Sequence, residues 1–212
     1  MKETFSIKRM KSQEAYEWIL KKHYAHRIPS IATGHCFGLY DVDKLVGVCT
    51  FGAPASRNLC IGICGEEFSW AVKELNRLCV DSDEINITSW FVSKCLSYLR
   101  TATIIVSYAD TSMGHIGKIY QACNFLFTGT TKERTDIGSG EGKHSRHYDK
   151  GQDYSKNREQ RSAKHRYVYF CGSKKERKRF QNALKYPILE YPKGETQRYD
   201  ASYKTTSQGI LF

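Results

Sequence analysis

The sequence predicts a single α/β (α+β) domain, with a central mixed sheet flanked by helices. TIIVSYAD, residues 103–110, is a continuous apolar run of the kind found in strands that are buried on both faces. HCFGLYDVDKLVGVCTFG, residues 35–52, places two apolar runs around a polar turn and predicts a β-hairpin. After that hairpin, strand patterns and helix patterns alternate, which is the order of a sheet covered by helices.

The other elements follow from hydrophobic periodicity and from capping residues. Residues 13–24 have helical spacing after Ser12, and Pro29 ends any continuation. We predict strands at 5–10, 71–80, 126–131 and 164–172, and helices at 13–24, 87–100 and 114–125. Residues 53–69 contain Gly and Pro and are predicted to be irregular. We place the domain at 1–182 with a basic insert at about 132–163, and a tail at 183–212 that either wraps the domain in extended form or is disordered.

The composition excludes several classes of protein. With 212 residues, 40% of them hydrophobic, the chain is able to bury one sizeable core. No apolar run approaches the roughly 18 residues of a membrane span, and the first residues contain no apolar signal-peptide core. We therefore expect a cytoplasmic protein with no membrane partner, whose eight cysteines are mostly reduced core thiols. Cys60 and Cys64 have ligand-like spacing, but without a second pair a zinc site is the minor alternative.

The net charge of +11 is concentrated in one stretch. Residues 142–180 hold 13 Lys or Arg against 4 Asp or Glu, so they carry +9 of it. His and Tyr residues interleaved with the charges are available to stack on bases, which a solubility tail does not need. We predict that this stretch binds nucleic acid, with a solvated basic loop as the alternative. The predicted contacts are Lys143, Arg146, Lys150, Lys156, Arg158, Arg161, Lys164 and Arg166.

The element order resembles that of the GNAT acyltransferase superfamily, an analogy of fold that proves no reaction. GNAT acetyltransferases bind the CoA pyrophosphate with a Gly-rich turn before a helix N-terminus. Here the corresponding junction, LCVDSDEINITSW at residues 78–90, has no glycine and has three acidic residues. Acidic side chains repel a pyrophosphate, so acetyl-CoA is the less favoured donor, although Thr88 and Ser89 could still donate to a phosphate.

Several stretches together resemble the Mom family of phage DNA-modification proteins. They are TFGAPAS (50–56), GICGEEF (62–68), ELNRLCV (74–80) and SYADTSMGHIGKIYQACNF (107–125), and the resemblance spans roughly residues 20–131 and the RYVYF strand. It implies a GNAT-like transferase, encoded by a phage or prophage, that acts on double-stranded DNA. The product it implies is adenine carrying a carbamoylmethyl, glycinamide-type group at N6, which protects the DNA from host restriction enzymes. It also implies a departure from acetyl-CoA and a proposed iron requirement.

Carried over by position, the resemblance makes five residues the candidate catalytic set: Tyr24, Arg77, Ser89, Asp110 and Tyr120. Their residue types leave alternatives open. Asp110 ends the buried strand, where it could be a general base toward N6, a metal ligand or a helix cap. Tyr120 could protonate a leaving group or belong to the core. Arg77 lies in an apolar segment and needs an anionic partner, either a carboxylate such as Asp110 or Glu74 or a substrate phosphate.

His23 and His115 are the candidate metal ligands. With Asp110 they would form a two-histidine, one-carboxylate set suited to iron, if the fold brings them together. The alternative for His23 is electrostatic stabilisation of a helix C-terminus.

The missing CoA turn and the basic stretch both suit a donor carried by RNA, and our hypothesis is a glycyl-tRNA. DNA binding alone also explains the charge. Two other functions stay open at this point. One is a conventional acetyl-CoA-dependent N-acetyltransferase, and the other is a non-catalytic DNA-binding protein on a GNAT-like scaffold.

Overall fold

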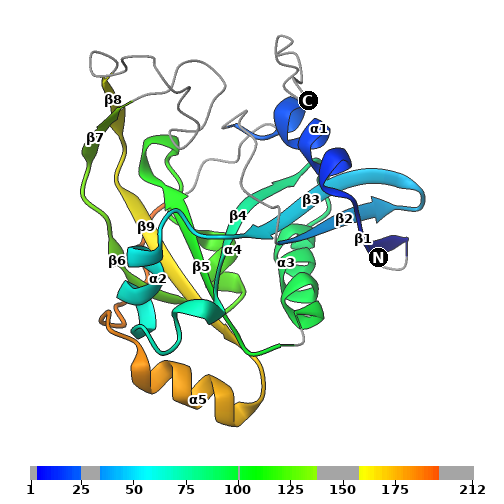
Figure 1. Cartoon of the computed structure of the whole chain (residues 1–212). Helices are drawn as coiled ribbons and strands as arrows, with labels where there is room; N and C mark the ends of the chain where they lie inside the picture. Colours follow the sequence, from blue (N-terminus) through cyan, green and yellow to red (C-terminus); the bar gives the residue numbers. More distant parts are fainter. Residues whose placement is uncertain (1–3, 25–33, 100, 138–157, 196–212) are drawn as a thin grey trace, which may run out of the picture.

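The computed structural model describes residues 4–24, 34–99, 101–137 and 158–195, and it confirms the predicted α/β architecture (Figure 1). The main sheet has seven strands in the order β1-β2-β3-β4-β5-β9-β6. It is mixed, because β4 and β5 are parallel and the other neighbours are antiparallel. The strands are β1 (Phe5–Arg9), β2 (His35–Asp41), β3 (Lys44–Gly52), β4 (Val72–Val80), β5 (Thr103–Asp110), β6 (Leu126–Thr130) and β9 (Lys164–Cys171).

Helices cover both faces of this sheet (Figure 1). One face carries α3 (Ile87–Tyr98) and α4 (Lys118–Ala122); the other carries α1 (Ser12–Lys22), α2 (Arg57–Cys64) and α5 (Lys174–Ala183). Successive residues of β5 supply both cores, Ile105 to the α3 side and Ile104 to the α2 side. The continuous apolar run of β5 therefore reflects burial on both faces, as predicted.

Two helices form where the sequence patterns predicted none. The irregular segment predicted at 53–69 is wrong, because it contains α2, whose N-cap Ser56 accepts a hydrogen bond from the Leu59 amide at 3.3 Å. The helix α5 begins with a capping box formed by Ser173 and Glu176. The helix consists mostly of charged and polar residues, and its one buried residue, Phe180, packs into the core between α5 and the sheet.

The helix predicted at 114–125 is shorter than expected. A turn of 3-10 helix (Thr111–Met113) precedes the predicted range, and α4 itself covers only Lys118–Ala122. Gly114 and Gly117 separate the two with φ of 64° and 79°, left-handed values that interrupt an α-helix. Gly117 is also fixed by space, since a Cβ there would lie 2.4 Å from the ring of Tyr167.

The strands β4 and β5 separate part of the way along the sheet. They pair over Val72–Glu74 and Ile104–Val106, and beyond that point the Ser107 hydroxyl donates to the Leu75 carbonyl at 2.9 Å. The pairing of β3 with β4 has a bulge, with Asn76 as the extra residue. Leu75, Leu78 and Val80 all pack on the α3 side, so the bulge turns Arg77 to the opposite side, toward α1.

Two further segments border this region. A separate ribbon pairs β7 (Arg134–Ile137) with β8 (Arg158–Arg161) and rises from the sheet beside β9 (Figure 1). The chain after α5 first passes α2, where the Lys185 amide donates to the Ile63 carbonyl at 2.8 Å, and then reaches β6, where Leu189 forms a bridge with Phe127. The Tyr191 hydroxyl donates to the Phe125 carbonyl at 2.8 Å. This matches the extended alternative for the start of the tail; residues 196–212 lie outside the described part. Within the described residues, no helix is long and apolar enough to cross a membrane.

Candidate active site

Asp110 is the last residue of β5, and its carboxylate is surrounded by hydrogen-bond donors. Oδ1 accepts from the amide and hydroxyl of Ser112, at 3.1 and 2.7 Å, and from the hydroxyl of Ser162 at 2.6 Å. Oδ2 accepts from Nζ of Lys164 at 2.8 Å, because Asp110 and Lys164 are direct partners in the β5–β9 register. The contact to the Ser112 amide makes Asp110 a cap of the 3-10 turn, which is one of the predicted alternatives.

These contacts fix the charge of Asp110. Burial raises the pKa of its carboxyl, but hydrogen bonds from Lys164, Ser162 and Ser112 lower it by more, so that the pKa falls to about 2. The group is ionised at neutral pH and is a weak base. It is therefore better suited to orienting an N–H group than to removing a proton from it.

Tyr24, just beyond the end of α1, connects several of the candidate residues. Burial and then the charge of Asp110 raise the pKa of Tyr24 to about 12, while the charge of Arg77 opposes the rise. Its ring stacks on His23, with centroids 4.4 Å apart, and meets His115 edge-on at 5.5 Å. Tyr24 is protonated at neutral pH and is able to donate a hydrogen bond. Residues far apart in sequence thus meet where β4 and β5 diverge.

His115 also lies beside Asp110 and Tyr24, and these three residues are called the Asp110 group below. Its amide donates to the Asp110 carbonyl at 3.2 Å, which fixes the backbone after the 3-10 turn. Burial lowers the pKa of the His115 ring, and the charge of Asp110 only partly opposes this shift. The ring is neutral at pH 7, and a neutral imidazole has one nitrogen lone pair that accepts a proton.

Tyr120 has a ring in the core, which is one of its two predicted alternatives, and its role as a proton donor stays a prediction. Its ring packs against Phe125 and Tyr167, with centroids 5.4 and 5.3 Å apart, so it is part of the core. Burial raises the pKa of Tyr120, a hydrogen bond with Ser107 lowers it, and proximity to Tyr24 raises it further. The hydroxyl end therefore faces the place where β4 and β5 separate.

Ser89 is held elsewhere. Its hydroxyl donates to the Asn86 carbonyl at 3.1 Å within the first turn of α3, and its carbonyl accepts from Sγ of Cys123 at 3.3 Å. These are helix and core contacts, so the catalytic role of Ser89 stays a prediction without geometric support.

The predicted metal set of His23, His115 and Asp110 is not assembled. In the described ranges, no group of three or more His, Cys, Asp or Glu side chains is placed to hold a metal ion. Both histidine rings contact Tyr24 instead. The eight cysteines are buried free thiols, including Cys60 and Cys64 in α2, as the core-thiol alternative predicts.

The predicted nucleic-acid contacts fall into separate groups. Lys143, Arg146, Lys150 and Lys156 lie outside the described residues. For Arg166 the structure favours an internal role over a phosphate contact. Its guanidinium lies 3.4 Å from the ring centroid of Tyr186 and donates to the hydroxyl and carbonyl of Thr128, at 3.0 and 2.8 Å. Lys164 is likewise engaged internally, since it holds Asp110.

Arg158 and Arg161 lie on the β7–β8 ribbon, which is anchored at Asp110. Ser162, which donates to Asp110, follows β8 directly. The next residue is Ala163, whose carbonyl accepts from the amide and hydroxyl of Thr111, at 3.2 and 2.7 Å. This ribbon, which carries three Arg against one Asp and one Glu and is called the basic ribbon below, therefore starts at the candidate site itself.

The junction between β4 and α3 is acidic in the structure. Asp81 forms an ion pair with Lys22 at 2.6 Å, and Asp83 and Glu84 follow before the helix. The N-cap residue Asn86 has φ of 62° and makes no side-chain hydrogen bond to the helix. Carboxylates at a helix N-terminus occupy the position that favours an anion and would repel a diphosphate.

Sequence reasoning missed the partners of Asp110. Ser112 and Ser162 had no assigned role, and Lys164 was assigned to nucleic acid rather than to Asp110. One signal was present for Lys164, because it begins the strand predicted at 164–172. An antiparallel pairing with the strand at 103–110 would have placed it opposite Asp110.

Comparison with known proteins gives two kinds of match. Residues 4–193 match the model of the Mom protein family. The methylcarbamoylase Mom of Escherichia phage Mu is 28% identical over 191 residues, which cover 82% of this chain and 78% of that protein. An N-acetyltransferase from Staphylococcus aureus Mu50 has a TM-score of 0.47 at 14% identity, over 78% of this chain and 98% of that chain. A ribosomal-protein-S5-alanine acetyltransferase from Vibrio fischeri has a TM-score of 0.49 at 11% identity, over 80% of this chain and 94% of that chain.

Proposed function

The chain belongs to the Mom family, and on that premise we propose that it is a transferase that modifies adenine at N6 in double-stranded DNA. The group we propose is of the carbamoylmethyl, glycinamide type, placed on phage DNA, where it protects against host restriction enzymes. The observation that carries the proposal is the fixed carboxylate of Asp110, beside Tyr24 and His115, at the base of a basic ribbon.

Asp110 and His115 have different roles toward the N6 amine of adenine. N6 is a weak nucleophile, because its lone pair is conjugated with the ring, and a base in duplex DNA must leave the stack to be reached. Asp110 accepts a hydrogen bond from the N6 amine and orients it. His115, neutral at pH 7, takes the proton that N6 loses as the new bond forms. This assignment moves the general base from Asp110 to His115, because the pKa of Asp110 is about 2.

The donor we propose is a glycyl-tRNA. N6 attacks the carbonyl carbon of the glycyl ester, the ester C–O bond breaks, and the tRNA hydroxyl leaves with a proton, for which Tyr24 or Tyr120 is the donor. The free glycyl amine then attacks C6 to close a five-membered ring, and the C6–N6 bond breaks. The glycyl nitrogen ends on C6 and the original N6 becomes the amide nitrogen, which is the carbamoylmethyl arrangement.

Purified protein, duplex DNA and glycyl-tRNA with labelled glycine test the reaction. We expect label in the DNA, and an adenine adduct after digestion to nucleosides. Asp110→Ala protein should transfer label at least about 100-fold more slowly. Asp43→Asn, a change at an exposed hairpin turn, should behave as wild type. Absence of label with protein that modifies DNA in cells would rule out this donor and leave the modification itself standing.

The two other functions predict different outcomes. A conventional N-acetyltransferase predicts saturable binding of acetyl-CoA, which the acidic β4–α3 junction disfavours. A non-catalytic DNA-binding protein predicts unaltered nucleosides in every sample. Isothermal titration with acetyl-CoA and nucleoside mass spectrometry separate the three.

A further inference from the structure

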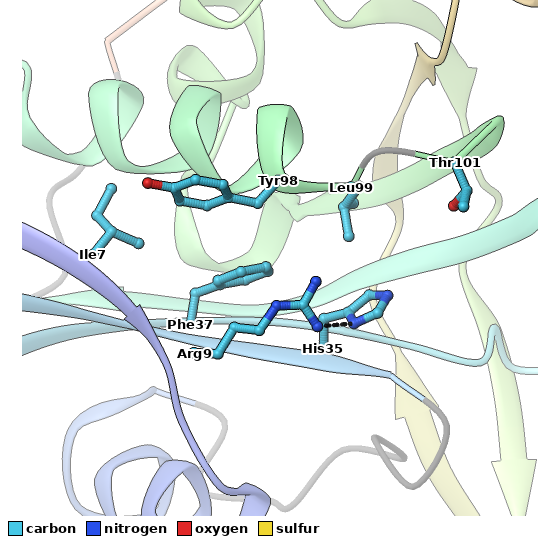
Figure 2. Close-up of a pocket in the computed structure, with 7 residues that line it drawn as sticks. All are labelled: Ile7, Arg9, His35, Phe37, Tyr98, Leu99 and Thr101. Carbon is cyan, nitrogen blue, oxygen red and sulfur yellow. Dashed lines mark hydrogen bonds between the residues drawn. The ribbon is translucent and has the colours of Figure 1, made fainter.

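A pocket that contains none of the Asp110 site residues lies on the α3 side of the sheet. It has a volume of about 590 Å³, within the range of roughly 300–1,000 Å³ of small-ligand sites. Its lining comes from β1, β2, the end of α3 and the connection from α3 to β5: Ile7, Arg9, His35, Phe37, Tyr98, Leu99 and Thr101 (Figure 2). Thr101 lies two residues before β5 and Asp110 is the last residue of that strand, so Thr101 and Asp110 lie at opposite ends of a strand about 23 Å long.

The lower wall of this pocket is basic. Nη1 of Arg9 lies 3.2 Å from Nδ1 of His35. A guanidinium only donates, so Nδ1 accepts, and the single proton of a neutral ring is then on Nε2. Burial lowers the pKa of His35, and the charges of Arg9 and Lys73 lower it further. The pocket therefore offers a permanent cation, a second positive charge nearby and a neutral N–H donor.

The charge of Arg9 is not neutralised within the described ranges. Its contacts there are His35 and the ring of Phe37, whose centroid is 5.5 Å from the guanidinium carbon, and no carboxylate lies within ion-pair distance. The lining residues include no Asp or Glu. An anion would thus meet attraction and no repulsion from the wall.

The upper wall is aromatic. The ring of Tyr98 lies over that of Phe37, with centroids 5.9 Å apart and planes 24° from parallel (Figure 2). Phe37 is fully covered, whereas Tyr98 is 41% exposed, so Tyr98 presents aromatic surface at the pocket. Aromatic surface next to an unneutralised cation suits a ligand that has both a planar ring and an anionic group.

We propose that this pocket binds a nucleotide, with its phosphate on Arg9 and Nε2–H of His35 and its base against Tyr98. Base stacking on an aromatic side chain and a charge-assisted phosphate contact are the two interactions that such a wall provides. The nucleotide is either free or part of a nucleic-acid strand, since both present the same chemistry. The proposal is independent of the transfer reaction at Asp110, because no residue is shared between the two sites.

Titration of the full chain with 5′-AMP, with adenosine and with a short fluorescent single-stranded oligonucleotide tests the proposal. We expect Arg9→Gln to weaken binding of 5′-AMP or of the oligonucleotide by at least about tenfold. Lys8→Gln, which removes an equal charge from the adjacent residue, should leave that affinity within about twofold. Tyr98→Ala should weaken the same ligand by roughly fivefold or more, and Tyr98→Phe should retain it.

The three ligands distinguish a free nucleotide from a nucleotide within a nucleic-acid strand. Binding of 5′-AMP that exceeds binding of adenosine indicates a free nucleotide, and a loss confined to the oligonucleotide indicates a nucleotide within a strand. The basic ribbon also attracts oligonucleotides, so the decisive quantity is the difference between Arg9→Gln and Lys8→Gln. Equal affinities for these two variants, or no saturable binding of either phosphate ligand by the wild type, would overturn the proposal.

Discussion

Asp110 and Arg9 are charged residues in the two candidate sites, and their surroundings are opposite. Asp110 accepts four hydrogen bonds from its own chain and is paired with Lys164. Arg9 donates to a neutral His35 and, among the described residues, has no carboxylate within ion-pair distance. A charge neutralised from within holds a fixed geometry, whereas a charge left without a counter-ion attracts a ligand. We infer that the first site is built to orient a reacting group and the second to bind an anion.

The largest effect that we expect comes from removing the base beside Asp110. His115→Gln should lower the modification rate by roughly 10² to 10⁴, the usual contribution of a general base. The pKa of His115 is lowered, so its base form prevails at neutral pH, and activity should fall only as the pH drops below the ordinary histidine value of 6.5. A rate–pH profile of the wild type measures this. An acid limb that persists in His115→Gln would assign the titration to another group.

The next effect concerns the backbone that carries His115. Gly117→Ala should lower the free energy of unfolding by about 2–4 kcal/mol, because it combines a left-handed φ of 79° with a Cβ at 2.4 Å from the ring of Tyr167. Urea unfolding measures the loss. Gly194→Ala is the matched control, since its φ is also positive and no atom lies within 4 Å of its Cβ. Equal losses for the two variants would show that strain alone, and not the contact with Tyr167, fixes this glycine.

Stability should respond differently to the two charged groups. Lys164→Met should lower the free energy of unfolding by about 1 kcal/mol, a value reduced for the partial exposure of the lysine. Arg9→Gln should change it by less than about 0.5 kcal/mol. The folded pKa of Asp110, about 2, lies below the ordinary 3.8, so the stabilisation is present above pH 4 and is lost as the pH falls toward 2. The free energies of unfolding of Lys164→Met and Arg9→Gln should therefore converge in acid. An undiminished difference between them at pH 2 would contradict the pairing of Lys164 with Asp110.

The smallest effect separates two arginines of the basic stretch. Arg158→Gln should reduce the slope of log K against log salt for duplex DNA by about one unit, because Arg158 is exposed on the ribbon. Arg166→Gln should leave that slope unchanged and lower stability instead, because its guanidinium is bound to Thr128 and Tyr186. Fluorescence anisotropy over a salt series measures the slopes. A larger change of slope for Arg166→Gln than for Arg158→Gln would reverse these roles.

The local parts of the fold were predictable from sequence, and the parts decided by long-range contacts were not. The apolar run of β5 and the hairpin of β2 and β3 follow from patterns within a few residues. The shortening at Gly114 and Gly117 depends on positive φ, and the helix α5 on one buried residue, Phe180, in a charged run. Neither feature produces a hydrophobic periodicity that the sequence alone would reveal.

The candidate site shows the same division. The family resemblance selected Tyr24, Arg77 and Asp110, and the structure brings these together. It could not supply Ser162 and Lys164 as partners of Asp110, since they meet it only through the β5–β9 register, and without them the low pKa of Asp110 was invisible. The Arg9 pocket was missed because its residues lie on three separate elements, none with a motif.

The central claim is that the Asp110 group is where adenine is modified. Nucleoside mass spectrometry of DNA from cells that express the wild type, Asp110→Asn or Asp43→Asn tests it most directly, with circular dichroism to confirm that each variant is folded. We expect an adenine adduct of carbamoylmethyl mass with the wild type and with Asp43→Asn, and a reduction of at least about 100-fold with Asp110→Asn, which no longer holds N6 in place. Wild-type levels of the adduct with folded Asp110→Asn would place the chemistry elsewhere in the protein.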